Sequence, residues 1–321
     1  MQKPIKKPFY DAKPIGTVKA LSRCLGVPET TLNELAEEAP NLYREASRKL
    51  KRDGTYRITY DALPSLKSVH DKILQRLLRR VAYPSYIQGG IRDPNSPRSP
   101  STNAKIHQGS EIIINIDVSR FYPSIGSKFI FNIWRGVFGF SPVVAELLTK
   151  LTTLNSVLPE GAKPSSYLAN LVFWRTESSL VVQLADEGIQ YTRYIDDISI
   201  SSRRRIGKSK IEAIIRLIHK MLNQHGLRIN RKKLKILGKG GRMVINNLTV
   251  NDKPSLPPEK RSQIRLIVHN LIERGAEIDP HMQLKSLRSA CGKVNYLAQF
   301  HPAEGAKLKS LLDQFRIDNG L

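Results

Sequence analysis

Apolar residues recur at helical spacing towards both ends of the 321-residue chain. Apolar positions three or four residues apart predict helices over residues 17–25 and 30–50, so the first 50 residues are expected to form a helical extension. The same spacing predicts helices over residues 259–274, 281–300 and 304–315. Both end regions are therefore expected to be helical.

The middle of the chain mixes strand and helix patterns. Residues 55–60 alternate between polar and apolar side chains, which predicts a strand. Residues 112–117 form a nearly continuous apolar run that ends in Asp117, typical of a strand buried on both faces. Two β-rich runs meet at Asp196-Asp197 and predict a hairpin. Further helices are predicted over 68–81, up to 137, over 142–154, 166–185 and 211–224, and a second hairpin over 243–252. The fold class is α+β.

Two loops interrupt these elements. Residues 84–101 contain Gly89-Gly90 followed by Pro94, Pro97 and Pro100, which predicts a flexible excursion without regular structure. In the second loop, residues 158–166, Gly161 and Ala162 would let a phosphate or a base pair approach the backbone. An ordinary capped helix start explains the same residues.

The charge balance points to a polyanionic partner. The chain has 52 Lys plus Arg against 28 Asp plus Glu, a formal net charge of +24. Residues 203–242 alone hold fourteen basic residues and a single acidic one, Glu212. A solvated surface explains part of this excess, but its density favours a groove for nucleic acid.

Cysteine content and hydrophobic runs indicate the compartment of the protein and its relation to membranes. The two cysteines, Cys24 and Cys291, are too far apart in sequence for a CxxC metal site or a disulfide framework, which fits the reducing cytoplasm. No run approaches the roughly 20 apolar residues that a membrane-spanning helix requires. We therefore expect a cytoplasmic protein without a membrane partner.

Three carboxylates are the candidate chemistry. Asp196 and Asp197 are adjacent, so each raises the pKa of the other unless a cation answers their charge. Asp117, at the end of a buried strand, also needs a partner. Two divalent cations bridged by such carboxylates perform in-line nucleotidyl transfer, and Mg²⁺ suits all-oxygen ligands. The alternative is a solvated acidic turn.

These residues resemble the reverse transcriptases, and among them the bacterial retron-type group. Tyr194-Ile195-Asp196-Asp197 matches the family's tyrosine-x-Asp-Asp box, and residues 115–125 look like the motif that carries the first catalytic Asp. Residues 103–107 fit the Asn-Ala-x-x-His pattern typical of retron enzymes. The resemblance covers roughly residues 50–255.

The resemblance implies a right-hand polymerase with fingers and palm around an antiparallel sheet and an α-helical thumb. Its divisions would be the extension (1–50), the first part of the fingers (51–110), the palm with inserted fingers elements (111–255) and the thumb (256–321). It also implies two Mg²⁺ ions held by Asp117, Asp196 and Asp197.

Roles for other residues follow from the same resemblance. Arg57 would meet the triphosphate of the incoming nucleotide, Tyr122 would exclude a ribose 2′-hydroxyl, and Lys233 would assist departure of pyrophosphate. The nucleotide site would also include Lys67, Gly161 and Ala162, although a basic residue on an exposed ribbon is often only solvated. The expected nucleic-acid contacts are Tyr194, Asn103, His107, Asn246, Asn247, Arg231 and Lys232.

The sequence departs from the family pattern in two motifs, and the proline-rich segment 94–100 looks like an insertion. Glu160 stands where the family loop usually has Gln, and Ile245-Asn246-Asn247 stands where retron enzymes often have Val-Thr-Gly. The first change adds a negative charge beside the expected nucleotide site.

The sequence therefore predicts an RNA-directed DNA polymerase that copies a structured noncoding RNA into DNA from dNTPs. The resemblance further implies a role in antiphage defence with a separate effector protein. Two alternatives stay open at this stage. One is a defence reverse transcriptase with self-priming or template-independent synthesis, and the other is a non-catalytic RNA-binding scaffold.

Overall fold

The computed structural model describes residues 7–51, 54–94, 96–274 and 279–320. The chain divides into two compact units. The first unit comprises Met1–Thr102 and Glu111–Ile236, and the second comprises Asn103–Ser110 and Leu237–Leu321. The predicted division into extension, fingers, palm and thumb remains a prediction.

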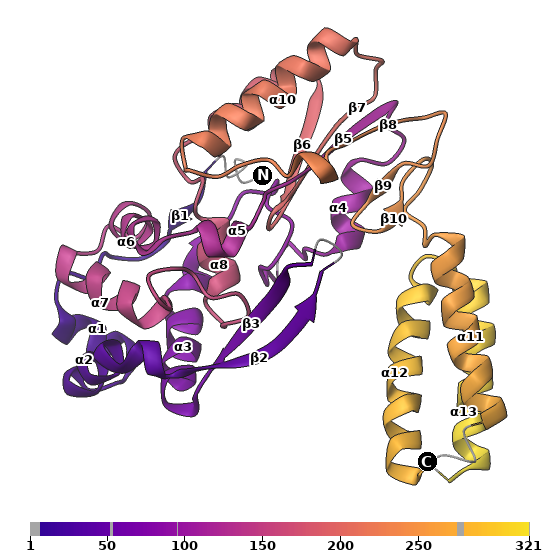
Figure 1. The fold of residues 1–321 in the computed structure, drawn as a ribbon, viewed down its shortest axis with the longest axis horizontal. Coiled ribbons are helices and arrows are strands. Elements are labelled where there is room, and N and C mark those ends of the chain that lie inside the picture. The colour runs from indigo at the N-terminus through magenta and orange to yellow at the C-terminus, as the bar shows by residue number, and fades with distance from the viewer. Residues whose placement is uncertain (1–6, 52–53, 95, 275–278, 321) are drawn as a thin grey trace. The chain divides into compact units, whose positions relative to one another are not determined.

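A four-stranded sheet lies at the centre of the first unit (Figure 1). Its strands are β5 (Ile112–Asp117), β6 (Ile189–Tyr194), β7 (Asp197–Ser202) and β8 (Lys235–Gly238), in the order β6-β7-β5-β8. β7 pairs antiparallel with both β5 and β6. The predicted buried strand and the predicted hairpin are thus confirmed, and Ile113, Ile114 and Ile116 of β5 are almost completely buried. The apolar run folds as a central strand because both of its faces are covered.

The first 50 residues are not all helical, which corrects the sequence prediction. The helices α1 (Val18–Leu25) and α2 (Glu29–Glu38) are present, but Tyr43–Leu50 forms strand β2, which pairs antiparallel with β3 (Tyr56–Ala62). A 3₁₀ turn, Ala39–Asn41, separates α2 from β2. Pro40 disfavours a continuous helix over residues 30–50, and pairing with a strand distant in sequence then outweighs the local helical pattern.

Helices pack around the central sheet and the two-stranded sheet β2–β3. They are α3 (Pro64–Arg76), α5 (Phe121–Ser124), α6 (Ser127–Gly136), α7 (Pro142–Thr152), α8 (Ser165–Asn170), α9 (Glu177–Asp186) and α10 (Lys208–Asn223). Two short strands, β1 (Phe9–Tyr10) and β4 (Val81–Ala82), pair with each other, and 3₁₀ turns occupy Leu78–Arg80 and Arg231–Lys233. The single helix predicted over 166–185 is instead two helices, because residues 171–176 form turns between them.

The loop predicted to be a flexible excursion is mostly held in place, which is a second correction. The side chain of Arg98 is 3% exposed and donates hydrogen bonds to the carbonyls of Tyr83, Pro84 and Ile87. Ile87 forms a β-bridge with Arg193 of β6. The loop ends in a helix, α4 (Pro100–Ile106). The buried Arg98 guanidinium thus provides hydrogen-bond donors for three loop carbonyls, which backbone N–H groups provide in regular secondary structure.

The second unit contains a small hairpin and a bundle of three helices. The predicted hairpin is confirmed as β9 (Val244–Ile245) and β10 (Leu248–Thr249), and the helices are α11 (Pro258–Arg274), α12 (Pro280–Ala298) and α13 (Pro302–Asp318). The helices lie side by side (Figure 1). Gly305 allows a close approach, because a Cβ atom there would collide with Ala298.

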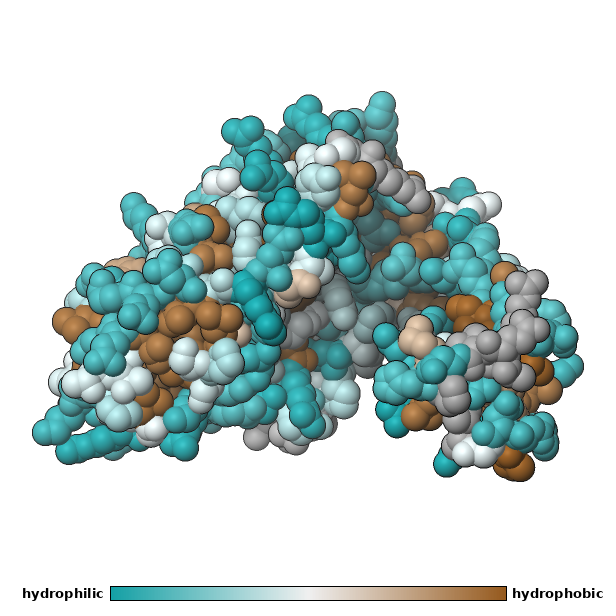
Figure 2. All heavy atoms as spheres, turned by 60° about the horizontal axis from the view of Figure 1, so that its bottom comes forward, coloured by the Kyte–Doolittle hydropathy of each residue, from teal (hydrophilic) through white to brown (hydrophobic). Residues whose placement is uncertain are grey.

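The surface is largely hydrophilic, as expected for a chain with a net charge of +24. Figure 2 shows hydrophilic residues over most of the visible face, with hydrophobic residues in separate patches. On α10, the apolar residues Ile214, Ile218 and Leu222 are buried while Lys208, Arg216 and Lys220 remain exposed. No helix among the described residues is long and apolar enough to cross a membrane.

Candidate active site

The three candidate carboxylates lie at one edge of the central sheet. In the strand register, Asp197 is opposite Asp117 on one side and opposite Tyr194 on the other. The backbone N–H of Val118 donates to the carbonyl of Asp196 over 3.0 Å. The folding of β5, β6 and β7 therefore brings together residues about 80 positions apart in sequence, as the sequence predicted.

Asp117 is already paired with basic and amide groups of the same unit. Lys233 Nζ lies 2.7 Å from Asp117 Oδ1, and Asn230 Nδ2 donates to Asp117 Oδ2 over 3.0 Å. The hydrogen bond to Asp117 raises the pKa of the Lys233 ammonium. Lys233 thus lies beside the carboxylates; like the neighbouring Arg231 and Lys232, it is exposed.

The surroundings of the other two carboxylates disfavour their ionised forms. Burial raises the pKa of Asp197 to about 7, and the nearby charges of Asp196 and Asp117 add to this effect. Burial likewise raises the pKa of Asp196. Lys233 opposes both shifts without cancelling them. Such a cluster favours a bound divalent cation, which would stabilise the ionised form of all three groups.

The donor set fits a hard divalent cation chemically. Asp117, Asp196 and Asp197 offer only carboxylate oxygens, the ligands that Mg²⁺ prefers. Among the described residues, no group of three or more His, Cys, Asp or Glu side chains is arranged to hold a metal ion by itself. A cation held by Asp117, Asp196 and Asp197 would need substrate or water oxygens to complete its coordination.

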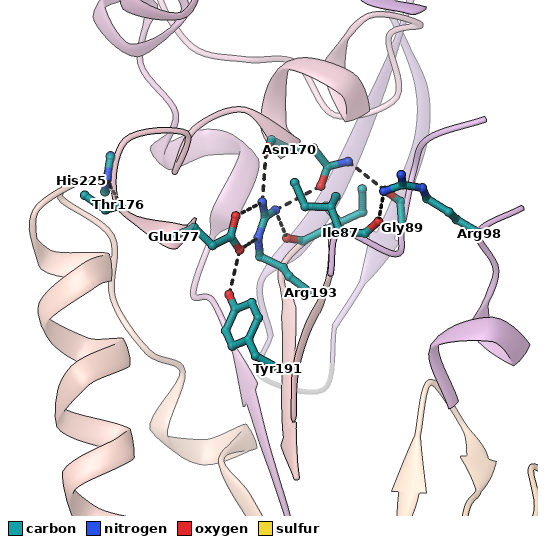
Figure 3. A network of polar contacts seen from close by, with 10 residues as sticks. Ile87, Gly89, Arg98, Asn170, Thr176, Glu177, Tyr191, Arg193 and His225 are labelled. Atoms are coloured by element: carbon teal, nitrogen blue, oxygen red, sulfur yellow. Dashed lines mark hydrogen bonds and ion pairs between the residues drawn. The ribbon is translucent and has the colours of Figure 1, made fainter. Parts of the chain in front are cut away.

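The backbone of the turn is held in an unfavourable conformation. Ile195 has φ 60°, a left-handed value that costs a β-branched residue about 1–2 kcal/mol. The Arg193 guanidinium donates to the Ile195 carbonyl over 3.0 Å. The same guanidinium binds both oxygens of Glu177 at 2.5 and 2.8 Å, and the side-chain and main-chain oxygens of Asn170 (Figure 3). Tyr191 completes the network with a hydrogen bond of 2.8 Å to Glu177.

This network was missed by sequence reasoning although it lies directly beneath the catalytic candidates. Arg193 and Glu177 are both almost completely buried, with side-chain exposures of 0% and 2%. A signal was present: Arg193 is a charged residue inside a β-rich run, and such a residue needs a partner if the strand is buried. The sequence does not show which acidic residue supplies it.

Two glycines let the preceding loop approach the turn. A Cβ atom on Gly89 would lie 2.8 Å from the Tyr194 ring, and one on Gly90 would collide with the Ile195 side chain. Asn170 Nδ2 donates to the Gly89 carbonyl over 2.8 Å, and Ser166 Oγ donates to the Gly90 carbonyl over 2.9 Å. The loop therefore contacts β6 and the turn on the side that does not pair with β7. Residues larger than Gly would not fit at positions 89 and 90.

The predicted nucleotide-binding residues are only partly brought together. Arg57 Nε donates to Glu160 Oε1 over 2.7 Å, and the charges of Asp196 and Glu160 contribute, after burial, to a raised pKa of Tyr122. Gly161 and the buried Ala162 follow Glu160 in the loop. Lys67 instead pairs with Asp61 at 2.8 Å. The nucleotide-binding roles of these residues remain predictions.

The predicted nucleic-acid contacts differ in exposure. Tyr194 is half-buried and Asn247 is exposed, but Asn103 and His107 are completely buried. Asn103 Nδ2 donates to Asn246 Oδ1 over 2.6 Å within the second unit. Burial lowers the pKa of His107 to about 4. Asn103 and His107 therefore help to build the second unit, and their contact with nucleic acid remains a prediction.

Comparisons with known proteins agree with this geometry. Residues 49–269 match the family model described as reverse transcriptase (RNA-dependent DNA polymerase). The retron Se72 reverse transcriptase of Salmonella heidelberg (strain 579083-10) is 30% identical over 315 residues, which cover 97% of this chain and 82% of the relative. The retron Ec48 reverse transcriptase of Escherichia coli is 27% identical, with coverage of 91% and 74%. A solved apo telomerase from Candida tropicalis is 12% identical with a TM-score of 0.43, covering 72% of this chain and 61% of the telomerase chain.

The chain belongs to the reverse transcriptase family, and its fold combines helices with antiparallel sheets. Within that family it is a retron-type reverse transcriptase, an RNA-directed DNA polymerase. The family uses divalent metal ions and RNA templates. The predictions of family, fold class and enzymatic activity are confirmed.

Proposed function

We propose that this reverse transcriptase copies a dedicated structured noncoding RNA into DNA from dNTPs, with two Mg²⁺ ions, as part of bacterial antiphage defence. The single observation that carries the chemistry is the meeting of Asp117, Asp196 and Asp197 at one sheet edge with an unbalanced negative charge. Two Mg²⁺ ions held there would activate the primer 3′-hydroxyl and neutralise the charge on the leaving pyrophosphate.

The protein's own groups would act around these carboxylates. Arg57 would hold the triphosphate, because a guanidinium binds phosphate oxygens through paired hydrogen bonds. Tyr122 would exclude a ribose 2′-hydroxyl through its ring. Lys233, 2.7 Å from Asp117, would donate a proton to the departing pyrophosphate.

The partners proposed for the protein follow from its charge and its relatives. The net charge of +24 and the basic stretch 203–242 support binding of a noncoding RNA and its DNA copy. The relatives are named as retron reverse transcriptases, a name with which a defence role is consistent. A cytoplasmic location and a separate effector protein are part of the same proposal.

The proposal is tested by purifying the protein with its bound nucleic acid, sequencing that nucleic acid, and supplying dNTPs with Mg²⁺. A fixed RNA joined to one DNA species is the expected product. A heterogeneous or homopolymeric product made without template would favour the self-priming, template-independent alternative instead.

The metal site is tested by the paired variant Asp196→Asn with Asp197→Asn. DNA synthesis should fall below detection, and chelation of divalent cations should have the same effect on the unmodified protein. Asp186→Asn is the matched control, because Asp186 is an exposed carboxylate on α9. Full activity in the paired variant would contradict the proposed metal ligands.

A further inference from the structure

An ion pair joins the two-stranded sheet β2–β3 to the loop 158–166. In this loop, Glu160 replaces the Gln that is usual in the family. Both Nε and Nη2 of Arg57 donate to Oε1 of Glu160, with an Nε–Oε1 distance of 2.7 Å. The two residues are 103 positions apart in sequence. The Arg57 side chain is 60% exposed, whereas that of Glu160 is 19% exposed. A largely exposed cation thus meets a carboxylate that is largely shielded from water.

The backbone fixes Glu160 independently of this ion pair. The N–H of Tyr60 in β3 donates to the Glu160 carbonyl over 2.7 Å. Gly161 has φ 105°, and a Cβ atom there would lie 2.8 Å from the Tyr60 carbonyl oxygen. The loop therefore stays against β3 when the Glu160 side chain is changed. The carboxylate is held in place before any ligand arrives, so its entropic cost of pairing with Arg57 is small.

Arg57 is also part of the electrostatic surroundings of the candidate active site. The hydrogen bond to Glu160 is the largest cause of the raised pKa of Arg57, and the charges of Asp196 and Tyr122 contribute as well. A polyphosphate that approaches the carboxylates would therefore meet a guanidinium that is already neutralised. To bind Arg57 through Nε and Nη2, that anion has to displace Glu160, and the Glu160 charge then stays nearby.

We propose that Glu160 is an internal anion that occupies Arg57 until the triphosphate of an incoming nucleotide replaces it. Glu160 thereby sets the dNTP concentration that the enzyme requires. This inference rests on the proposed triphosphate-binding role of Arg57. A neutral Gln at position 160 would keep one acceptor for Arg57 without the negative charge, so the triphosphate would displace it more easily.

The test is Glu160→Gln, assayed by steady-state primer extension. The KM for dNTP should fall about two- to fivefold, which is the change in affinity expected from the loss of one partly exposed ion pair. The kcat should stay nearly constant. Inhibition by inorganic tripolyphosphate, which carries no base or sugar, should strengthen by the same factor. Both differences should shrink at high salt, because exposed charges are screened.

Two further variants isolate the ion pair. Glu187→Gln removes one negative charge from another ion pair of the first unit, with Lys210, and should leave the KM unchanged. In an Arg57→Gln background, Glu160→Gln should no longer lower the KM, because the competition for the guanidinium is gone.

An unchanged or raised KM in Glu160→Gln would overturn the inference, since the carboxylate would then not compete with the triphosphate. The tripolyphosphate assay separates this failure from that of the proposed function. If Arg57→Gln leaves inhibition by tripolyphosphate unaltered, Arg57 does not bind the triphosphate and the proposed function of that residue fails first.

Discussion

Two hairpin turns of this protein solve the same backbone problem in different ways. In the first unit, the turn after β6 places Ile195 at φ 60°; in the second unit, the turn between β9 and β10 places Asn246 and Asn247 at φ 47° and 64°. Asn tolerates left-handed backbone because its short polar side chain can bond locally, whereas a β-branched residue does not. The residues of the second turn therefore tolerate its backbone conformation, and Asn103 adds one hydrogen bond to Asn246, whereas the conformation of Ile195 requires support from outside.

The support of the first turn is extensive and buried. Glu177 and Asn170 fix the Arg193 guanidinium (Figure 3). Arg193 in turn binds the Ile195 carbonyl, and Gly89-Gly90 bring a loop against the turn. Strain that persists at a functional site is maintained by the structure around it. The turn that carries the catalytic candidates is thus positioned by the fold, while the Asn-Asn turn is specified by local sequence.

The largest expected effect is on the support of the first turn. Arg193→Met should destabilise the protein by about 3–5 kcal/mol, because Glu177 would be left as a buried, unpaired charge. DNA synthesis should fall on the order of a hundredfold, since displacement of the turn moves Asp196 and Asp197. Urea unfolding and primer extension measure the two effects separately.

A triple variant distinguishes positioning from stability. Arg193→Met, Glu177→Met and Tyr191→Phe together remove the charged pair and the hydroxyl bound to it. Replacement of a buried ion pair by apolar residues is often neutral, so most of the stability should return. The rate of synthesis should stay low, because the Ile195 carbonyl still lacks its donor. Full recovery of the rate would show that Arg193 has no positioning role.

The second expected effect is a pH-dependent stability of the second unit around the hairpin β9–β10. His107 lies in the segment 103–110, which hydrogen-bonds to the hairpin through Asn103–Asn246 and through Gly109 N–H to the Val250 carbonyl. Burial lowers the pKa of His107 to about 4, below an unfolded value of about 6.5. The unfolded state then binds more protons between these values, so stability is full above pH 6.5 and falls as the pH decreases.

Between pH 7 and pH 5, protonation of His107 in the unfolded state should lower the free energy of unfolding by roughly 2 kcal/mol. Hydrogen exchange of the amides in residues 244–250 should accelerate at pH 5 beyond the intrinsic change in exchange rate, and His107→Gln should remove the additional acceleration. The same amides in His107→Gln are the control, because the first hairpin contains Asp197, whose pKa is raised to about 7 and which therefore titrates in the same range. Equal acceleration in the unmodified protein and in His107→Gln would contradict the assignment to His107.

The contrast between the turns also explains what the sequence could predict. The strand 112–117, both hairpins and the three helices after residue 258 follow from patterns within a short window, and the structure confirms them. Strand β2 was predicted as helix because its pairing with β3 depends on another segment. Local periodicity contains no information about such a partner.

The candidate site shows the same limit. The three Asp residues could be predicted, because a carboxylate at a strand end and an Asp-Asp turn are visible as sequence motifs. The partners Glu177, Asn170 and Gly89 could not, since each lies in a different segment and contributes only after folding. The sequence identified Glu160 as unusual, but its ion pair with Arg57 depends on the approach of the loop to β3.

The smallest expected effect concerns the Asn-Asn turn itself. Asn247 is exposed and has φ 64°, so Asn247→Ile places at this position the residue type that the first turn holds at φ 60°. Without an equivalent of the Arg193 network, the substitution should cost about 1–2 kcal/mol, and exchange of the hairpin amides should accelerate about five- to thirtyfold. Asn247→Gly is the matched control, because Gly adopts left-handed backbone without strain, and its exchange should stay close to that of the unmodified protein. Unchanged exchange in Asn247→Ile would mean that an isoleucine needs no external support in such a turn, and the Arg193 network would then have to be explained by something other than the conformation of Ile195.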